Sequence, residues 1–350
     1  MNPSPSRRLL LGAVYPPLGA ATRLRLGLAA DAGRRIGDDV RTWTFLDDDD
    51  YGPWIAGGAG RLAGVRHARG AISRWSGLSA SAAVAVVQRE LLPVNSSHLE
   101  RRFARSDRPW VWDVDDTVWV AASRPYAAVR GGLRKFAWMA AAATEIWAGS
   151  QVIAEWCAAR GAGNVHHVPT LPEAYLLDPV DREDDLLVWV GTPATQGFLR
   201  AFLLDNAAAL SGWRVLAVGG RLDPIPGIAL ACRPWSRDNE RSALARATAG
   251  LYPIDTRIEY TKGKSALKAL LYQAHGIPMI ATDAPAVRAV FEPGSGCLVS
   301  STGEVRDALA AVADEGSRAA MAAAALVAHA RDYDRDAWAA WLAGRLSLLA

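Results

Sequence analysis

The stretch VAVVQRELLPVNSSHLERRFARSDRPWVWDVDDTVW, from Val84 to Trp119, has the pattern of a strand, a helix and a second strand. Val84–Arg89 is mostly apolar, Ser96–Arg105 has helical periodicity, and Val111–Val114 is apolar again. Two strands separated by a helix predict a parallel pair, because parallel strands need a long crossover connection. This stretch therefore indicates an α/β domain built on a parallel sheet.

The same alternation continues in both directions along the chain, between segments rich in alanine and arginine. It predicts doubly wound α/β folds throughout. The expected strands are Leu9–Tyr15, Val40–Leu46, Val84–Arg89, Val111–Val114, Glu145–Gly149, Val165–Val168, Leu186–Val190, Arg214–Val218, Ile228–Ala231, Gly250–Ile254, Pro278–Thr282 and Cys297–Val299. The expected helices are Ala20–Arg35, Ser96–Arg105, Arg130–Ala143, Gln151–Arg160, Phe198–Leu210 and a last helix at the end of the chain.

The chain of 350 residues is long enough for two domains with ordinary cores, since 51% of its residues are hydrophobic. Residues 171–185, LPEAYLLDPVDREDD, are rich in proline and charge and lack periodicity, which predicts a linker. We expect Rossmann-like domains at 1–170 and 186–332, followed by a helix at 333–350. Ligands of such folds bind at the carboxyl ends of the strands, so a cleft between the two domains is the expected site.

Composition excludes several classes of protein. The net charge of +3 argues against a nucleic-acid binder. The three cysteines are far apart and lack metal-ligand spacing, so a reduced, cytoplasmic setting is expected. The apolar run near the N-terminus is too short for a membrane span and is broken by two prolines, which favours a first strand over a signal peptide.

Three carboxylates, Asp113, Asp115 and Asp116, stand at the end of an apolar strand, where a charge is costly without a partner. Three interpretations are open. The motif matches the first motif of haloacid-dehalogenase-type phosphatases, in which Asp113 would be the nucleophile and Asp115 the acid, with magnesium. It also matches the metal-binding triplet of single-domain glycosyltransferases. The third interpretation is structural: the carboxylates cap a helix or pair with arginines.

Lysine is rare in this sequence. Of 39 basic residues only four are lysines, and three of them, Lys262, Lys264 and Lys268, fall within KGKSALK. A compact ammonium beside a helix start suits a phosphate, so we expect Lys264 and Lys268, one helical turn apart, to face a diphosphate together. Nothing in this arrangement requires a metal. The alternative is a basic helix start that has no ligand.

Several segments, in order, resemble a bacterial subgroup of the large group 1 family of GT-B glycosyltransferases. The QREL–P strand followed by the DVDDT strand resembles that subgroup's QREL–P and DxDDA-aromatic pair. The segments ATRLRL, IWAGSQVIAEWCAARGAGNVHHVPT, VWVGTPATQGFL and GKSALKALLYQAHGIPMIATD are similar to its further motifs. The resemblance covers most of the chain and depends on the order and spacing of short motifs.

The resemblance implies a transferase that moves a sugar from a nucleoside-diphosphate sugar to a small-molecule, glycan or lipid-linked acceptor, with retention and without a cofactor. It also implies a last helix that packs back on the N-terminal domain. The expected catalytic residues are Asp115, Asp116 and Lys264. The expected donor ligands are Gly191, Thr192, Asp255, Lys264, Ser265 and Lys268. The expected acceptor ligands are Gly19, Thr22, Arg23 and Asp113.

The sequence departs from the family in two places. Two glutamates eight residues apart, common in the family, are replaced by Gly263 and Leu271, and GTPATQG lacks the usual basic pair. The donor sugar is therefore left open, and a non-catalytic, glycosyltransferase-like binding protein remains an alternative. The basic segment 61–74 suits either a lipid-linked acceptor at the inner face of a membrane or a solvated helix.

Overall fold

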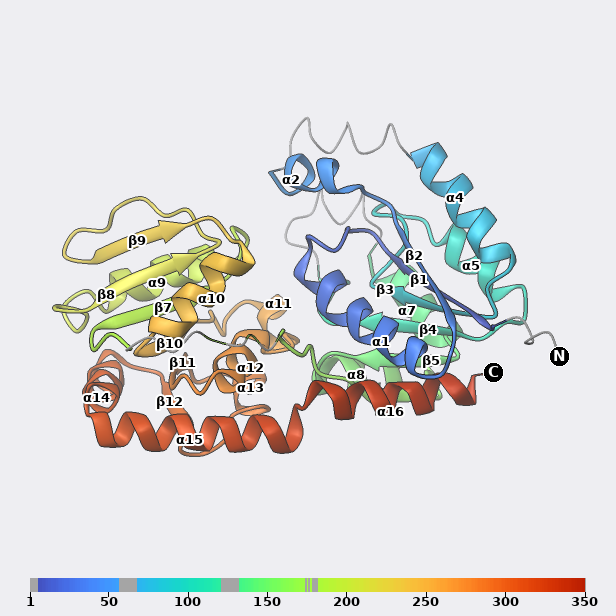
Figure 1. Cartoon of the computed structure of the whole chain (residues 1–350). Helices are drawn as coiled ribbons and strands as arrows, with labels where there is room; N and C mark the ends of the chain where they lie inside the picture. Colours follow the sequence, from blue (N-terminus) through green and yellow to red (C-terminus); the bar gives the residue numbers. More distant parts are fainter. Residues whose placement is uncertain are drawn as a thin grey trace. The chain divides into compact units, whose positions relative to one another are not determined.

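A computed structural model of the chain describes residues 6–56, 68–120, 132–173, 175, 177 and 182–349 (Figure 1). The fold divides into two compact units. The first contains Met1–Thr170, Gly263–Ser265 and Arg335–Ala350, and the second contains Leu171–Lys262 and Ala266–Asp334. Part of the basic segment, with Arg61, Arg66 and His67, lies outside the described residues.

The first unit is built on a parallel sheet in the order β2-β1-β3-β4-β5-β6. Its strands are β1 (Arg8–Ala13), β2 (Asp39–Thr44), β3 (Val84–Gln88), β4 (Trp110–Val114), β5 (Glu145–Ala148) and β6 (Val165–His167). Its helices are η1 (Thr22–Leu26), α1 (Gly27–Arg35), α2 (Asp48–Ala56), α4 (Ala68–Ala80), α5 (His98–Ala104), α7 (Leu133–Ala142), α8 (Gln151–Ala158) and α16 (Arg335–Leu348). The strand order reverses between β1 and β3, so the loops that follow these two strands flank the switch point of the sheet.

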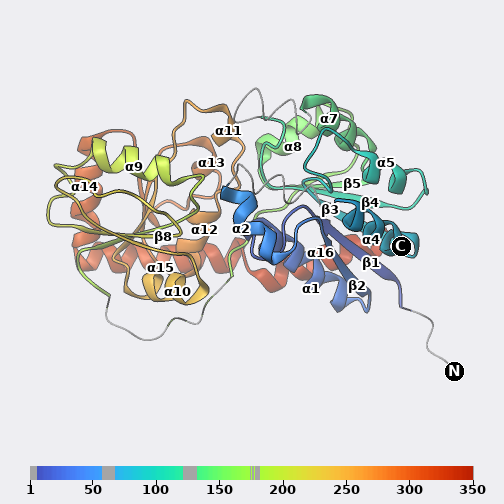
Figure 2. The same ribbon diagram turned by 90° about the horizontal axis from the view of Figure 1, so that it is seen from above.

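The last helix belongs to the first unit, as the resemblance implies. Helix α16 packs against α1 (Figures 1 and 2), and its buried face carries Leu342 and Leu346. Arg345 of α16 also forms an ion pair of 2.7 Å with the buried carboxylate of Glu145. The helix is therefore held by an apolar stripe and by a partly buried ion pair.

The second unit repeats the architecture with a sheet in the order β12-β11-β10-β7-β8-β9. Its strands are β7 (Leu186–Val190), β8 (Arg214–Val218), β9 (Ala229–Arg233), β10 (Ala249–Tyr252), β11 (Met279–Thr282) and β12 (Gly296–Val299). Its helices are α9 (Gln196–Asp205), α10 (Arg237–Arg246), α11 (Glu259–Lys262), α12 (Leu267–Ala274), α13 (Pro285–Arg288), α14 (Thr302–Ala313) and α15 (Glu315–Asp332). All strand pairs of both sheets are parallel.

Each of the twelve expected strands is present, displaced by two residues at most at either end. The expected linker packs on the second unit where it is described. The Tyr175 backbone N–H donates to His275 Nε2 at 3.1 Å, and Arg182 donates to the carbonyls of His275 and Gly276. No helix in the described parts of the chain has the length and apolar character needed to cross a membrane.

Candidate functional site

Asp115 follows β4 directly and is fixed by two neighbours from the end of β3. Arg89 donates to both of its carboxylate oxygens, at 2.6 and 2.8 Å, and Gln88 Nε2 donates to Oδ1 at 3.0 Å. Burial raises the pKa of this carboxyl, but the charge and hydrogen bonds of Arg89 outweigh burial and lower it below its ordinary value. Asp115 is therefore ionised and held in one orientation at neutral pH.

Asp116 shares the same arginine, because Arg89 Nη2 lies 3.5 Å from its Oδ2. Arg89 has a positive φ of 58°, a conformation that costs a non-glycine residue about 1 kcal/mol or more. Its backbone N–H donates to the Asp113 carbonyl at 2.7 Å, which helps to impose that conformation. Backbone strain of this kind is common at functional sites, and here it aims one guanidinium at two carboxylates.

Asp113 is buried and paired with Arg25 of η1. Nε of Arg25 lies 2.9 Å from both carboxylate oxygens, and Nη2 lies 2.5 Å from Oδ1. The other terminal nitrogen of Arg25 donates to the Val168 carbonyl at 2.8 Å and to Thr170 Oγ1 at 3.0 Å. Burial disfavours the charge on Arg25, but the Asp113 carboxylate outweighs it and raises the pKa of Arg25.

The Arg25–Asp113 pair affects two expected roles of Asp113, that of a phosphatase nucleophile and that of an acceptor ligand. A phosphatase nucleophile must reach its substrate, whereas the Asp113 side chain is 2% exposed and enclosed by a guanidinium. The same enclosure leaves the expected acceptor contact of Asp113 without support from the geometry. The pair instead holds η1 against the ends of β4 and β6, so we assign Asp113 to the framework of the site.

The loop after β1 and the first turn of η1 carry the other expected acceptor ligands. Thr22 is buried, and its hydroxyl donates to the Tyr15 carbonyl at 3.0 Å. Arg23 donates to the carbonyls of Pro17 and Leu18 at 3.3 Å, and its backbone N–H donates to Gly19 O. The π-helical geometry of η1, a form frequent at functional sites, places these residues at the switch point of the first sheet.

In the second unit, β7 and β10 separate at their carboxyl ends, where the order of that sheet reverses. Their pairing covers only Ala249–Leu187 and Gly250–Val188. The Tyr272 hydroxyl lies beyond this pairing, 3.1 Å from the carbonyls of Val188 and Leu251. Burial raises the pKa of Tyr272, so the phenol is neutral. A switch point with diverging strands is the usual ligand crevice of an open α/β sheet.

Lys268 lies one helical turn before Tyr272 on α12 and on the same face. Its Nζ is 5.5 Å from the ring centroid of Trp189 on β7 and 5.3 Å from that of Tyr252 on β10. Two aromatic rings thus attract the ammonium to the carboxyl ends of the two strands that flank the crevice. The structure therefore places one ammonium where a doubly wound fold binds ligands.

Gly191 follows β7 beside this crevice and cannot be replaced without a clash. A Cβ at Gly191 would lie 2.2 Å from Cζ2 of Trp189, so the indole closes over a bare backbone. The backbone N–H of Gly191 donates to Val218 O at 2.9 Å. The turn continues through Thr192, which is exposed, into the N-terminus of α9. The backbone of this turn and the ammonium of Lys268 therefore lie at the same end of the second sheet.

Two further expected donor ligands have different surroundings. Asp255, after β10, accepts hydrogen bonds from the backbone N–H and from two side-chain nitrogens of Arg257, and these bonds lower the pKa of Asp255. Ser265 is half-buried, and its hydroxyl makes no hydrogen bond within the described ranges. Asp255 is thus engaged in a local turn, while Ser265 retains its bonding capacity.

The spacing of Lys264 and Lys268 predicts one helix that carries both and opens at Gly263–Ser265, and this prediction is wrong. Helix α12 begins at Leu267, because Ala266 has a left-handed conformation (φ 50°) that interrupts the helical path. Lys264 therefore lies before the helix and does not share a helix face with Lys268. Within the first unit, Ser150 Oγ donates to Gly263 O at 3.1 Å, and a Cβ at Gly263 would lie 2.2 Å from Thr117 Cγ2.

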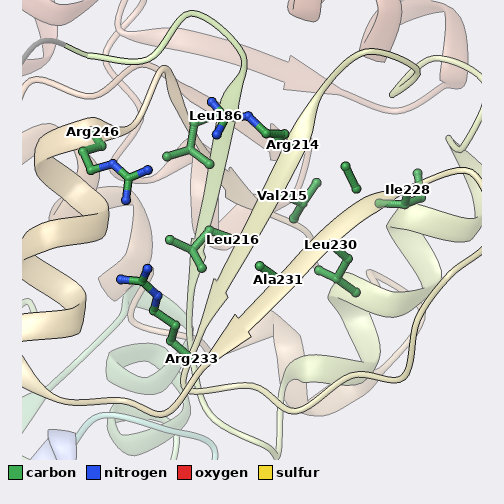
Figure 3. A pocket seen from close by; sticks show the side chains of 10 residues that line it. Leu186, Arg214, Val215, Leu216, Ile228, Leu230, Ala231, Arg233 and Arg246 are labelled. Atoms are coloured by element: carbon green, nitrogen blue, oxygen red, sulfur yellow. The ribbon is translucent and has the colours of Figure 1, made fainter.

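Two other features of the described chain do not form a comparable site. Within the described part of the chain, no group of three or more histidine, cysteine or acidic side chains could hold a metal ion. A hollow of about 470 Å³ runs along β8 and β9 of the second unit, bordered by Arg214, Arg233 and Arg246 (Figure 3). It begins at the amino ends of the strands, and Arg214 and Arg246 are neutralised by Glu183, so it lacks the features of the crevice.

Sequence reasoning missed three residues of these sites: Arg25, Arg89 and Tyr272. Arg25 and Arg89 lie within the motifs TRLRL and QREL, and their position in these motifs could have identified them as candidate site residues. Their partners lie 88 and 26 residues away along the chain, and only the register of neighbouring strands brings them together. Tyr272 is four residues after Lys268, the spacing that places two side chains on one face of a helix, and this spacing is visible in the sequence.

No family model and no curated protein matches the sequence. Several solved structures resemble the fold. The crystal structure of Alr3699/HepE from Anabaena in complex with UDP has a TM-score of 0.67 at 14% identity, and covers 97% of this chain and 100% of that one. The same protein in complex with UDP-glucose has a TM-score of 0.66 at 15% identity, over 98% of this chain and 99% of that one.

A mutant O-GlcNAc transferase from Thermobaculum terrenum has a TM-score of 0.54 at 14% identity, over 100% of this chain and 69% of that one. Sequence identities this low establish the fold alone. The chain has the GT-B fold, with two parallel six-stranded sheets in Rossmann-like units. This confirms the fold class that the sequence predicts.

Proposed function

We propose that this chain is a glycosyltransferase that takes its sugar from a nucleoside-diphosphate sugar. The observation that carries the proposal is the position of Lys268, whose ammonium is held by Trp189 and Tyr252 at the switch point of the second sheet. The fold resemblance to a protein solved in complex with UDP and with UDP-glucose supports a nucleotide-sugar donor and makes uridine the first base to test.

In this proposal the second unit binds the donor. The diphosphate lies over the Gly191–Thr192 turn, where the absence of a side chain at Gly191 allows close approach, while Lys268 supplies an ammonium. Cleavage of the sugar–phosphate bond places negative charge on the leaving diphosphate. A fixed ammonium at that point stabilises the transition state more than the ground state.

The first unit is proposed to bind the acceptor at the ends of β1 and β4. Asp115 and Asp116 share Arg89, so the pair retains net negative charge and several acceptor oxygens for sugar hydroxyls. Asp116, whose side chain is 14% exposed, is the better placed of the two to touch substrate or to accept a proton. We further propose that transfer proceeds with retention and without a metal ion.

Binding of UDP, UDP-glucose, GDP-, ADP- and dTDP-sugars, measured by calorimetry with magnesium or with a chelator, tests the proposal. We expect a uridine nucleotide to bind equally well in both conditions. Replacing Lys268 with Gln should weaken binding about tenfold or more, since a charge-assisted bond to phosphate is lost. Lys262 is the matched control, because it is exposed and paired with Glu259, and K262Q should bind normally.

Failure of every nucleotide to bind would refute the proposal. Binding of a nucleotide sugar with no release of nucleoside diphosphate, with or without sugar and lipid acceptors, would favour the non-catalytic alternative. Proton NMR of a product formed from an α-linked donor separates retention from inversion by the anomeric coupling constant. Loss of turnover in the chelator would contradict the metal-free mechanism.

A further inference from the structure

A second polar hollow lies in the first unit, between the loop after β3 and the first turns of α5 and α7. It has a volume of about 340 Å³. Every side chain that lines it is polar or basic, and no acidic side chain is among the described residues that line it. They include Ser96, Ser97, His98, Arg101, Arg134 and Lys135. The chemistry of this lining is that of an anion site.

Arg101 is fixed in place before any ligand arrives. Its Nε donates to Ser97 Oγ at 2.9 Å, and its guanidinium carbon lies 4.1 Å from the ring centroid of Trp138. Its two terminal nitrogens make no hydrogen bond to the parts of the chain that the structure describes. A guanidinium restrained in this way loses little conformational entropy when it binds, and it presents a paired set of N–H donors.

Arg134 supplies a second guanidinium from a different helix, α7. It is exposed and makes no hydrogen bond or ion pair within residues 6–56, 68–120, 132–173, 175, 177 and 182–349. Many arginines of this chain pair with carboxylates, whereas Arg101 and Arg134 border one hollow and have no acidic partner among the described residues. Their mutual repulsion is a cost that an anion between them would remove.

Lys135 shapes the hollow although its own charge is already used. Its Nζ lies 2.6 Å from Oε2 of the buried Glu90 and donates to the carbonyls of Leu92 and Val94 at 2.8 Å. These three bonds tie the loop after β3 to the start of α7. Ser96 and Ser97, which follow shortly after Val94, therefore lie on a loop that is already ordered.

We propose that this hollow binds a phosphate group carried by the acceptor. Two guanidinium groups from separate helices, together with serine hydroxyls, offer donors from several directions, which suits the three peripheral oxygens of a phosphate. The hollow belongs to the unit that carries Asp115 and Asp116. The assignment of the phosphate to an acceptor depends on the proposed function, whereas anion binding by the hollow does not.

His98 lines the hollow, so its ring proton reports binding there. We would titrate the full chain with inorganic phosphate at constant pH and ionic strength and follow the His98 Hε1 resonance, assigned by its loss in H98Q. A saturable shift is expected in the wild type. R101Q and R134Q should each weaken phosphate binding about tenfold. The matched control is R102Q, since Arg102 is exposed on the same helix outside the hollow, and it should change the affinity less than twofold.

Three outcomes would overturn the proposal: a shift that chloride reproduces at equal ionic strength, a shift that R101Q and R134Q leave intact, or no shift. Methyl phosphate distinguishes the source of the group. A phosphate on an acceptor has an esterified oxygen, so methyl phosphate should bind within about threefold of inorganic phosphate. Rejection of the ester would overturn the acceptor assignment.

The affinity for UDP, measured on the same variants, separates this proposal from the proposed function. R101Q and R134Q should leave UDP binding unchanged, and K268Q should weaken UDP binding while leaving the His98 shift intact. If UDP does not bind but phosphate does, the proposed function fails and the anion site stands. If UDP binds and phosphate does not, the anion site is refuted and the proposed function stands.

Discussion

Arg25 encloses the carboxylate of Asp113 with hydrogen bonds to both of its oxygens, although the two residues are 88 positions apart. Both side chains are 2% exposed. A buried pair of this kind contributes little net stability relative to apolar residues of equal volume, but removal of one partner leaves an uncompensated buried charge. The Arg25–Asp113 pair is thus a framework that fixes where η1 meets the sheet.

We expect Asp113→Asn and Arg25→Gln each to lower the free energy of unfolding of the first unit by about 3–5 kcal/mol. The double variant R25M/D113L should recover much of that loss, because it removes both charges together. Urea unfolding followed by circular dichroism measures these differences. Additive losses in the double variant would contradict the pairing, as would a wild-type stability in either single variant.

Asp116 should matter for the rate rather than for donor binding. We expect Asp116→Asn to lower the rate of nucleoside-diphosphate release about 10²–10⁴-fold, the usual range for loss of a proton acceptor, with an unchanged donor Kd. Asp107→Asn is the control, because Asp107 is exposed and its positive φ is one that asparagine accepts. A parallel loss of donor affinity in D116N would show that Asp116 serves binding instead.

Gly191 and Gly197 make a matched pair at the start of the second unit. Alanine at Gly191 would overlap the Trp189 ring, so we expect a cost of about 1–3 kcal/mol and weaker donor binding as the indole that supports Lys268 moves. Alanine at Gly197, on α9, meets no atom within 4 Å and should stabilise the unit by up to about 1 kcal/mol. Urea unfolding and calorimetry check both. A tolerated Gly191→Ala would mean that the indole is not held by this contact.

His275 should make the second unit sensitive to acid. Burial lowers the pKa of His275, its Nδ1 faces the Leu271 carbonyl at 2.8 Å, and its Nε2 accepts from the Tyr175 backbone N–H. The positive charge of Arg182 opposes protonation further. The folded unit therefore binds this proton less readily than the unfolded chain does.

The sign follows from proton linkage. The contribution of neutral His275 to the free energy of unfolding is fully present above the pKa of an unfolded histidine, about 6.5, and decreases as the pH falls below that value. Unfolding measured from pH 7.5 to 5 should show this decline, and His275→Gln should flatten it. His98→Gln, a change at an exposed histidine, should leave the slope as it is. An identical slope in H275Q and the wild type would assign the acid sensitivity to other groups.

The sequence by itself determined the elements of this fold. All twelve strands could be located from short apolar runs, because residue periodicity acts within a few positions of each residue. It also singled out the Asp113–Asp116 cluster, the turn at Gly191 and the rare lysine Lys268. These features are local in the sequence, so they can be recognised without knowing which strands are neighbours in the sheet.

Tertiary structure alone decided what these side chains do. Strand order and register brought Arg25 to Asp113 and Arg89 to Asp115, and thereby divided three neighbouring carboxylates into one that is enclosed by Arg25 and two that share Arg89. A left-handed Ala266 removed Lys264 from the helix of Lys268. Such pairings depend on contacts between residues far apart in the chain, whose geometry local periodicity does not encode.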